Sequence, residues 1–438
     1  MEITLPKVNR RLLTPTFICL WIIMFLIEFV KGALLVSILP VYMGDVLGLS
    51  ALAIGLSFST QYIGDNLFRS PAGWLIGRIG FRSTMTLGIC VMFVAVFLIT
   101  FMKQMEFIVL GCALLGIGTS PLWPCVMMGV SAVTEKNNNF ATAMGVIQIS
   151  SLGGTGLGPV LINFLVGISY SLVFGVLLGC IGIVILVSLA LPGIERVKDA
   201  QTPLLENNQA GSLSLNLAGQ GNKLKQLQGK VVRTIREVRR NINVSRLLYP
   251  ALFLQSFAVG LLTPVITLFV RTELGLSPEQ FSLMLIIGGG FTVLGLIPIG
   301  RLADRLGTRI FLNTGFALAS VSIGLFAYSR GMPDSLVWGL VILIGMSYAC
   351  ILPSWNTMVS TLLPKEEKGA VWGFFLAIQG TGMVVGPIVS GRLWDLFGSH
   401  APFLASSGSM AMLFLLHLLL SRRTSAAMDK KRLRGQRT

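Results

Sequence analysis

The sequence predicts an all-α membrane protein with twelve transmembrane helices in two six-helix halves. Three observations support this prediction: an apolar composition, a recurrence of long hydrophobic runs and an internal repeat. Of 438 residues, 53% are hydrophobic and only 12% are charged, and the mean hydropathy is +0.79. This balance excludes an ordinary soluble domain.

The hydrophobic runs recur along nearly the whole chain. Each has about 18 or more residues, enough to cross a bilayer core of about 30 Å as a helix. They lie near residues 16–40, 51–75, 82–103, 106–132, 139–168, 170–192, 248–270, 279–300, 309–329, 335–362, 369–392 and 401–420. The first run is too long to predict a cleavable signal peptide.

Basic residues are distributed unevenly around these runs. With a cytoplasmic N-terminus, the inner segments hold 28 of the 34 lysines and arginines. The positive-inside rule therefore predicts a multi-pass protein with both termini in the cytoplasm. The net charge of +16 then reflects topology and attraction to an anionic inner leaflet, rather than binding of nucleic acid.

The two halves repeat one another at a nearly constant offset. FLIEFVKG at 25–32 aligns with FLQSFAVG at 253–260, which is 228 residues later. GLS at 48–50 aligns with GLS at 275–277 at an offset of 227. Parallel repeats of six helices are typical of secondary transporters, which bind substrate between the halves near the membrane midplane.

The repeat divides the chain into four parts. They are an N-terminal six-helix bundle at 1–193, a cytoplasmic linker at 194–246, a C-terminal six-helix bundle at 247–421 and a basic cytoplasmic tail at 422–438. The linker begins as a polar, flexible segment and continues as a basic amphipathic helix predicted to lie on the inner leaflet. A solvated charged helix is the alternative. The tail is predicted to be disordered.

Four ionisable residues lie deep inside the first two hydrophobic runs: Glu28, Lys31, Asp65 and Arg69. A charge at bilayer depth costs about 2.5 kcal/mol or more, so such residues usually face a cavity or an ion path. A carboxylate beside a cation in that position suits a proton carrier. The alternative is two internal ion pairs that only tie helices together.

The second half has no ionisable residue at the same depth. Its polar side chains in the middle of predicted spans are neutral, chiefly Gln255, Asn356 and Gln379. A cavity between the halves would therefore have a charged wall and an apolar wall, the shape expected for an amphiphile with a polar head and a lipid tail. Trp123 and Trp355 could stack on a sugar or an acyl chain, with helix packing as the alternative.

A glycine- and arginine-rich loop follows the second span and returns after the eighth. The residues are Gly73, Arg78, Gly80 and Arg82 in the first copy, and Gly300, Asp304, Arg305, Gly307 and Arg309 in the second. The loop resembles the signature loop of the major facilitator superfamily, although Gly77 replaces the aspartate in the first copy. Glycine permits a tight turn, and the charged groups are predicted to hold an inner gate.

A second motif combines glycine and proline on the fifth and eleventh spans. Its residues are Gly154, Gly158 and Pro159, with a copy at Gly382, Gly386 and Pro387. It resembles the glycine–proline motif of superfamily exporters. Either the proline bends a helix that must flex, or the small residues only let helices approach closely.

Several longer stretches resemble one subfamily, the lipoteichoic-acid glycolipid flippases of Gram-positive bacteria. They are FLIEFVKG, LLGIGTSPLW, SYACILPSWNTMVSTLL and VWGFFLAIQGTGMVVGP. The resemblance implies a proton-coupled antiporter that moves a glucosyl-diacylglycerol anchor lipid across the bacterial cell membrane. It also implies that Glu28, Lys31, Asp65 and Trp123 line the hydrophilic part of its cavity.

The chain departs from the subfamily pattern at two positions. Lys31 stands where the subfamily has arginine, and Ser151 stands where it has a tryptophan on the fifth helix. Lysine lacks the fork of donors that arginine offers, and a platform for stacking on a sugar is missing. Both departures concern the headgroup rather than the mode of transport.

We therefore expect a transporter, not an enzyme, that works as a monomer on membrane lipids and protons. The proton gradient is its energy source, and no cofactor or metal is expected, because neither the six cysteines nor the two histidines assemble into a site. A proton-driven exporter of drugs or other hydrophobic solutes on the same scaffold is the alternative. A membrane enzyme or a non-transporting sensor is the alternative hypothesis from a different functional class.

Overall fold

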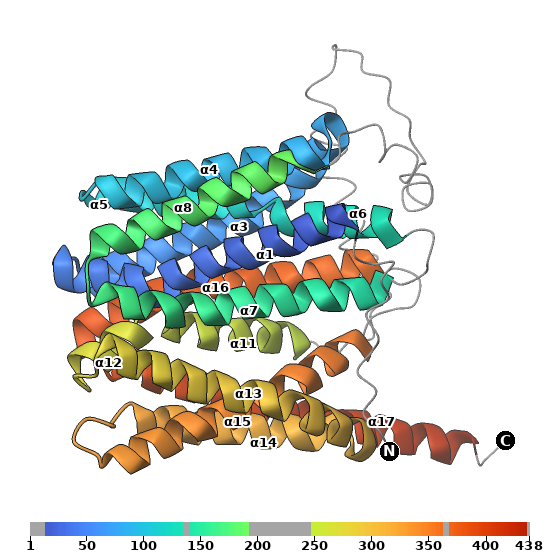
Figure 1. The fold of residues 1–438 in the computed structure, drawn as a ribbon. Helices are drawn as coiled ribbons and strands as arrows, with labels where there is room; N and C mark the ends of the chain where they lie inside the picture. Colours follow the sequence, from blue (N-terminus) through green and yellow to red (C-terminus); the bar gives the residue numbers. More distant parts are fainter. Residues whose placement is uncertain (1–13, 135–139, 192–246, 362–367, 436–438) are drawn as a thin grey trace, which may run out of the picture.

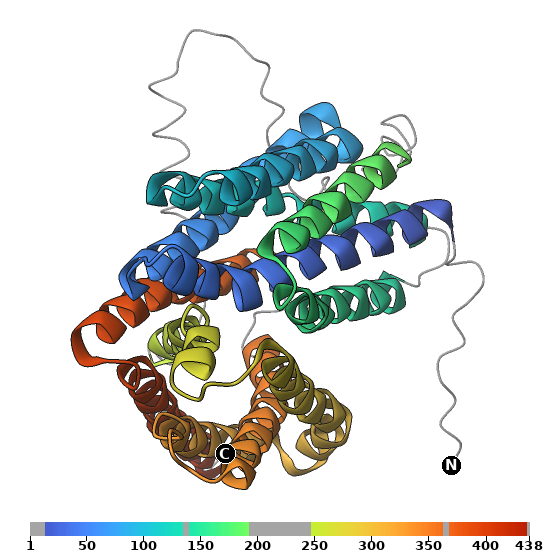
Figure 2. The same cartoon turned by 60° about the vertical axis from the view of Figure 1, so that its left-hand side comes forward.

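The computed structural model describes residues 14–134, 140–191, 247–361 and 368–435. The predicted linker helix lies outside the described residues. Helices from the first half gather on one side of the molecule and helices from the second half on the other (Figures 1 and 2). Each half has its own cluster of buried apolar side chains.

The first half begins with a long, nearly continuous rod. Helix α1 (Pro15–Gly32) is followed by the π-helical turn η2 (Ala33–Ile38), α2 (Leu39–Val41) and a second π-helical turn, η3 (Tyr42–Val46). Thr14 caps the rod, because its hydroxyl accepts a 3.2 Å bond from the backbone N–H of Phe17. The remaining helices of the first half are α3 (Ala51–Ile79), α4 (Phe81–Phe101), α5 (Met105–Thr119), α6 (Leu122–Thr134), α7 (Phe140–Val166) and α8 (Tyr170–Leu189).

The second half repeats this order. It consists of α11 (Leu248–Leu262), α12 (Ile266–Thr272), α13 (Pro278–Leu306), α14 (Thr308–Phe326), α15 (Asp334–Thr361), α16 (Lys368–Phe397) and α17 (Ala401–Gly435). The prediction of a disordered tail is wrong for residues 422–435, because α17 continues to Gly435. Those residues include alanine, methionine, lysine, arginine and leucine, which favour helix, and no proline interrupts them.

Ten of the described helical segments are long and apolar enough to cross a membrane. They coincide with ten of the twelve predicted spans. The other two predictions fall on α3 and α16, which have 29 and 30 residues. Polar and ionisable side chains such as Asp65 and Arg69 lower the apolarity of α3. The all-helical fold class is confirmed, whereas the count of twelve spans stays a prediction.

Glycines bring α7 against α1 with no room for a side chain. A Cβ atom added at Gly154 would lie 2.3 Å from the carbonyl oxygen of Phe25, and one at Gly158 would lie 2.2 Å from that of Phe29. Gly382 does the same in the second half, where its Cβ would lie 2.5 Å from the carbonyl oxygen of Phe253 on α11. The motif glycines therefore serve helix packing in both halves, and α7 and α16 continue through Pro159 and Pro387.

The two ends of the bundle differ in how the halves meet. We call the end where α1 and α11 begin the terminal face, and the opposite end, where α3 and α13 begin, the distal face. The halves pack through α3 against α16 and α7 against α13. Hydrogen bonds across these seams lie toward the distal face: Ser282 of α13 donates to the carbonyl of Val160 at 3.1 Å, and Thr267 of α12 donates to that of Val36.

Candidate functional site

The structure brings the four deep ionisable residues of the first half into one group. Glu28 and Lys31 lie on α1, and Asp65 and Arg69 lie on α3. Lys31 is within electrostatic reach of the other three and of the Tyr62 side chain. We call these five residues the charged cluster. Two separate ion pairs are the alternative that the sequence leaves open, whereas the structure places Lys31 between α1 and α3.

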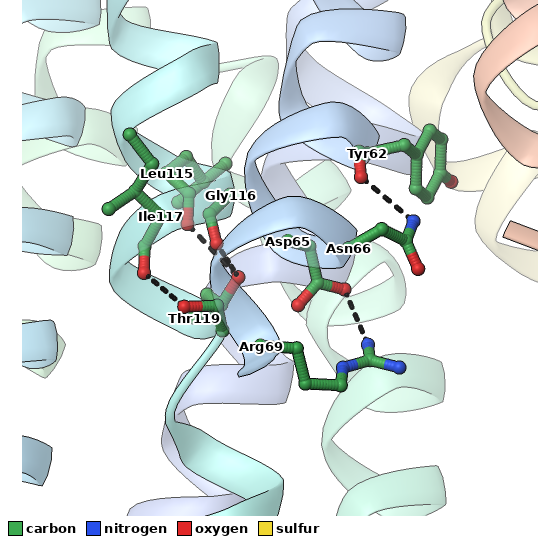
Figure 3. A network of polar contacts seen from close by, with 9 residues as sticks. Tyr62, Asp65, Asn66, Arg69, Leu115, Gly116, Ile117 and Thr119 are labelled. Carbon is green, nitrogen blue, oxygen red and sulfur yellow. Dashed lines mark hydrogen bonds and ion pairs between the residues drawn. The ribbon is translucent and has the colours of Figure 1, made fainter. Parts of the chain in front are cut away.

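Asp65 and Arg69 form an ion pair one helical turn apart. Arg69 Nη2 lies 3.0 Å from Asp65 Oδ2, as Figure 3 shows. The Asp65 side chain is 14% exposed and that of Arg69 is 39% exposed. A carboxylate that is shielded from water but paired with a partly exposed cation can exchange its partner for a proton without leaving its position.

The turn of α3 that carries Asp65 is fixed by its contact with α5. A Cβ atom added at Gly116 of α5 would lie 2.0 Å from the carbonyl oxygen of Gln61 and 2.8 Å from the backbone nitrogen of Asp65. Gln61 is fully buried there, and among the described residues both polar atoms of its amide lack a hydrogen-bond partner. Close packing of this kind gives the carboxylate one orientation.

Glu28 has a different partner from the one that the sequence suggests. It is 7% exposed, and its Oε2 accepts a 3.3 Å hydrogen bond from the Thr155 hydroxyl of α7. Within the described part of the chain, the salt bridges are Arg69 with Asp65 and Arg330 with Glu273, so Glu28 and Lys31 do not pair directly. Glu28 is thus held by a neutral donor.

Two residues at this site were not predicted from the sequence: Tyr62, which belongs to the charged cluster, and Thr155, which bonds Glu28. Tyr62 precedes Asp65 by three residues and therefore lies on the same face of α3. Its hydroxyl interacts with Thr263 at the end of α11, in the second half. Thr155 lies inside the glycine–proline motif, whose glycines and proline the sequence assigns to helix packing or bending. Helical spacing from Asp65 is a signal that could have found Tyr62.

The polar residues of the second half come together only in part. Gln379 of α16 donates from Nε2 to Oε1 of Gln255 on α11 at 3.4 Å, and Ser256 donates to the same oxygen at 3.2 Å. Asn356 is exposed on α15. The second half thus offers a small neutral amide pair.

The two predicted tryptophans pack against the cores of their halves. Trp355 is 5% exposed and meets Phe316 edge-on, with ring centroids 6.1 Å apart. Its indole N–H has no hydrogen-bond partner among the described residues. Trp123 is partly buried against the first-half core. Helix packing accounts for Trp355, and a role for Trp123 in a sugar site stays a prediction.

An apolar cavity of about 340 Å³ lies in the second half against α7. Its walls are mainly aliphatic and aromatic, with Leu262, Phe281, Met284 and Phe326 among them. Thr155 belongs to the same wall. Because Thr155 also bonds Glu28, the apolar cavity begins beside the charged cluster.

A second cavity, of about 640 Å³, lies between α3 and α16. Its walls combine Asn66 and Arg69 with apolar residues, including Leu67, which is 65% exposed. Asn66 also contacts α16 there, because a Cβ atom added at Gly380 would lie 2.7 Å from its Oδ1. The cavity thus connects a surface leucine with the cation of the ion pair.

The two signature loops form tight turns at the terminal face. Gly80 and Gly307 have φ angles of +85° and +93°, a region that residues with a side chain rarely adopt. Arg82 donates from Nη2 to the carbonyl of Leu189 at the end of α8, at 2.6 Å. Arg78 lies over the ring of Trp74, at 3.9 Å from its centroid.

The remaining loop residues give less information about a gate. Gly73 has open space around it, and Arg305 and Arg309 are exposed. Gly300 lies within α13. The side chain of Asp304 lies outside the described residues, so its role in an inner gate stays a prediction.

The described residues hold no group of three or more His, Cys, Asp or Glu side chains that could bind a metal ion. The cluster can instead carry a proton and offer hydrogen bonds. Its carboxylates accept, Lys31 and Arg69 donate, and the Tyr62 and Thr155 hydroxyls can do both. This chemistry suits a polar headgroup with hydroxyls.

Comparison with known proteins agrees with this architecture. A family model described as Major Facilitator Superfamily matches residues 20–246 and 248–437. The chain is 27% identical over 386 residues to a protein of Staphylococcus saprophyticus named proton-coupled antiporter flippase LtaA, covering 86% of this chain and 87% of that one. It is 25% identical over 381 residues to the protein of the same name in Staphylococcus aureus, with the same coverage.

The fold also resembles a solved transporter. The crystal structure of the nucleoside transporter NupG superposes with a TM-score of 0.74 at 16% sequence identity, covering 92% of this chain and 98% of that one. At this identity the likeness concerns the fold alone. Together, these matches confirm the two resemblances found in the sequence.

Proposed function

Because the chain belongs to the Major Facilitator Superfamily, we propose that it is a proton-coupled antiporter that flips a lipid-linked amphiphile by alternating access. Its family makes it a multi-pass transporter of a cell membrane. Four features go beyond family membership and belong to the proposal: the substrate class, the coupling ion, the twelve spans and the cytoplasmic location of the terminal face. The name of the staphylococcal relatives supports a proton-coupled flippase, and the resemblance to glycolipid flippases makes a glycosylated diacylglycerol the best candidate for the substrate.

The observation that carries the proposal is the contrast between two adjoining walls. The charged cluster belongs to the first half, and the apolar cavity of about 340 Å³ is lined mainly by the second. Thr155 touches both, since it bonds Glu28 and lines the cavity. A molecule with hydroxyls at one end and hydrocarbon at the other satisfies both walls, because neither end leaves a buried polar group unpaired.

The apolar cavity is large enough for part of a lipid tail. Ligand pockets usually enclose about 300–1,000 Å³, so this cavity lies at the low end of that range. Only part of a diacyl chain can be enclosed, and the rest must extend toward the bilayer. The cavity beside Arg69 and Leu67 gives the headgroup a route between α3 and α16 from the surface of the protein.

Protons have a defined place in this scheme. Asp65 and Glu28 are the carboxylates of the charged cluster, and each is shielded from water. Protonation of Asp65 would release Arg69 from the ion pair, which changes the hydrogen bonds offered to a headgroup. Binding of proton and headgroup would then exclude one another, as antiport requires.

The test is a proteoliposome assay with the purified protein. It follows flipping of a labelled glucosyl-diacylglycerol and, separately, efflux of a cationic dye, each with and without a pH gradient. We expect the gradient to accelerate glycolipid flipping and to leave dye efflux near the level of empty liposomes. Dye efflux driven by the gradient without flipping of the lipid would make the protein a drug exporter and overturn the proposal.

A further inference from the structure

We propose that Asp395 of α16 holds the distal face closed by capping α3 of the opposite half. Its Oδ1 accepts from the backbone N–H of Ala51 at 3.1 Å, and its Oδ2 accepts from that of Leu52 at 2.9 Å. We call this contact the distal latch. It belongs neither to the charged cluster nor to the signature loops, and its function is to set the balance between the two access states.

The latch stands at the end of a tight seam between α3 and α16. A Cβ atom added at Gly391, one turn before Asp395, would lie 2.2 Å from the carbonyl oxygen of Ala51. One turn further, a Cβ atom at Gly55 would lie 2.1 Å from the carbonyl oxygen of Pro387. This close backbone contact places the exposed Asp395 side chain at the start of α3.

The N–H groups at the start of a helix have no partner within the helix. In α3 the Ser50 hydroxyl accepts from the third of them, Ala53, at 3.2 Å. Asp395 supplies the acceptors for the first two. Because the start of a helix also carries a partial positive charge, a carboxylate is favoured there over a neutral acceptor.

Among the described residues, no carboxylate of the opposite half caps the start of α13 at the equivalent seam between α7 and α13. Pro278 begins α13 and has no N–H to satisfy. Ser277 and Gln280 form a capping box within the same half. The residue that matches Asp395 in the repeat, at an offset of 228, is Gly167. Helix α13 therefore caps itself, whereas α3 depends on the other half.

This asymmetry has a conformational consequence. Opening the distal face separates Asp395 from α3 and leaves two N–H groups of α3 for water to satisfy, whereas the bond that α13 makes across its seam, from Ser282 to the carbonyl of Val160, has no charged acceptor. The latch therefore favours the state described here, in which the halves are joined at the distal face. The inference rests on alternating access in the proposed function but not on the substrate or on proton coupling.

The test measures distances between spin labels in the full-length protein in nanodiscs, without lipid substrate or pH gradient. One label pair spans the distal face, at Val46 and Tyr328, which are 51% and 55% exposed. The other pair spans the terminal face, at Ser83 and Ile310, both exposed. The native cysteines are first replaced, and transport by that background is checked.

In the Asp395→Ala variant we expect the ratio of distal-open to distal-closed populations to rise about tenfold, the size expected for losing hydrogen bonds to a charged group. Asp395→Asn should give a smaller rise, since it keeps one acceptor. Asp334→Ala is the matched control, because Asp334 is an exposed carboxylate in the first turn of its own helix, α15. Asp334→Ala should leave the distances of both label pairs unchanged.

A third variant separates the latch from a general loss of stability. Ala51→Pro removes one of the two N–H groups and copies the start of α13, so Asp395→Ala should then shift the distal distances less than in the parent. If Asp395→Ala does not fold, the distal latch is tested by comparing the distal distances of Asp395→Asn with and without Ala51→Pro. Unchanged distal distances, an equal shift in Asp334→Ala or no coupling to Ala51→Pro would overturn the latch, and would leave the flipping assay unaffected.

Discussion

The first helix of each half packs in the same way but carries different chemistry. Phe25 and Phe29 of α1 correspond to Phe253 and Phe257 of α11, and the two rings stack in both halves, with centroids 6.3 Å and 5.5 Å apart. Between them, Glu28 is replaced by Ser256. The duplicated unit thus keeps its glycine contacts and its aromatic pair, while the ionisable Glu28 has a neutral counterpart.

This difference shows which features depend on packing and which depend on function. A helix pair held by glycine contacts tolerates little change, so the repeat preserves it. A buried charge lowers stability unless it is paired, so it persists only where it is used or neutralised. The four predictions below test this division, from the largest expected effect to the smallest.

Removing the charge of Asp65 or Glu28 should have the largest effect. Asp65→Asn and Glu28→Gln should each lower proton-driven transport by about 10³-fold, since an amide does not carry the proton. Folding should be nearly normal, because both amides can keep the hydrogen bonds to Arg69 and Thr155. Flipping under a pH gradient measures the effect. Glu106→Gln is the control, because Glu106 is an exposed carboxylate of α5. Normal transport rates in both cluster variants would show that proton coupling does not depend on Glu28 or Asp65.

Adding a charge to the second half should have the next largest effect. Gln255→Glu places an unpaired carboxylate beside Gln379 and Ser256, where it must be desolvated when hydrocarbon fills the cavity. Flipping of a diacyl glycolipid should fall about a hundredfold, a cost of about 3 kcal/mol, while efflux of a cationic dye stays the same or rises.

Gln255→Met is the control, because it keeps the length of the side chain without the charge. Normal flipping by Gln255→Glu together with loss of dye efflux would contradict an apolar second wall. The two substrates have to be followed in the same preparation.

Adding one methyl group to the shared glycine contact should destabilise both halves alike. Gly154→Ala and Gly382→Ala force a Cβ atom against a backbone carbonyl, so each should lower the free energy of unfolding by about 3 kcal/mol, the usual upper range for overpacking. Gly156→Ala, two residues from Gly154, is the control because its Cβ meets open space. Thermal unfolding in detergent measures the change. Equal melting temperatures for Gly154→Ala and Gly156→Ala would show that the contact is not tight.

The smallest effect concerns the signature loops. The second copy has Asp304 where the first has Gly77, so Asp304→Ala should make the second loop resemble the first. We expect a shift of about 1–3 kcal/mol toward the state that is open at the terminal face. Spin labels at Ser83 and Ile310 should move apart. Gly77→Ala is the control, and an unchanged distance distribution in Asp304→Ala would exclude a gate at this loop.

Features that spacing along the chain determines were largely predictable from the sequence, and the partners that side chains find on other helices were not. Helical runs, the repeat and the glycine motif follow from local periodicity, so Gly154 and Gly382 could be assigned together. Whether Lys31 pairs with Glu28 or lies between α1 and α3 depends on how two helices face each other, which spacing along one helix does not determine. Asp395 illustrates the same limit, because its partner is 344 residues away.

The prediction of the tail failed for a related reason. A basic, polar segment after a hydrophobic run favours disorder by composition, but α17 is already formed when the chain reaches residue 422. Extending an existing helix requires no new nucleation, and each further residue adds one backbone hydrogen bond. For Trp355 the sequence leaves stacking on a ligand and helix packing open, and the structure shows it in the core beside Phe316.

The signature turns have a mechanical consequence for the moving protein. A single residue, Gly80, separates the end of α3 at Ile79 from the start of α4 at Phe81, and Gly307 does the same between α13 and α14. Because only one residue connects the two helices, α4 must move when α3 tilts. Arg82 then passes the displacement to the end of α8 through its bond to Leu189. A lever of this kind would transmit a local change at Asp65 to the periphery of the first half.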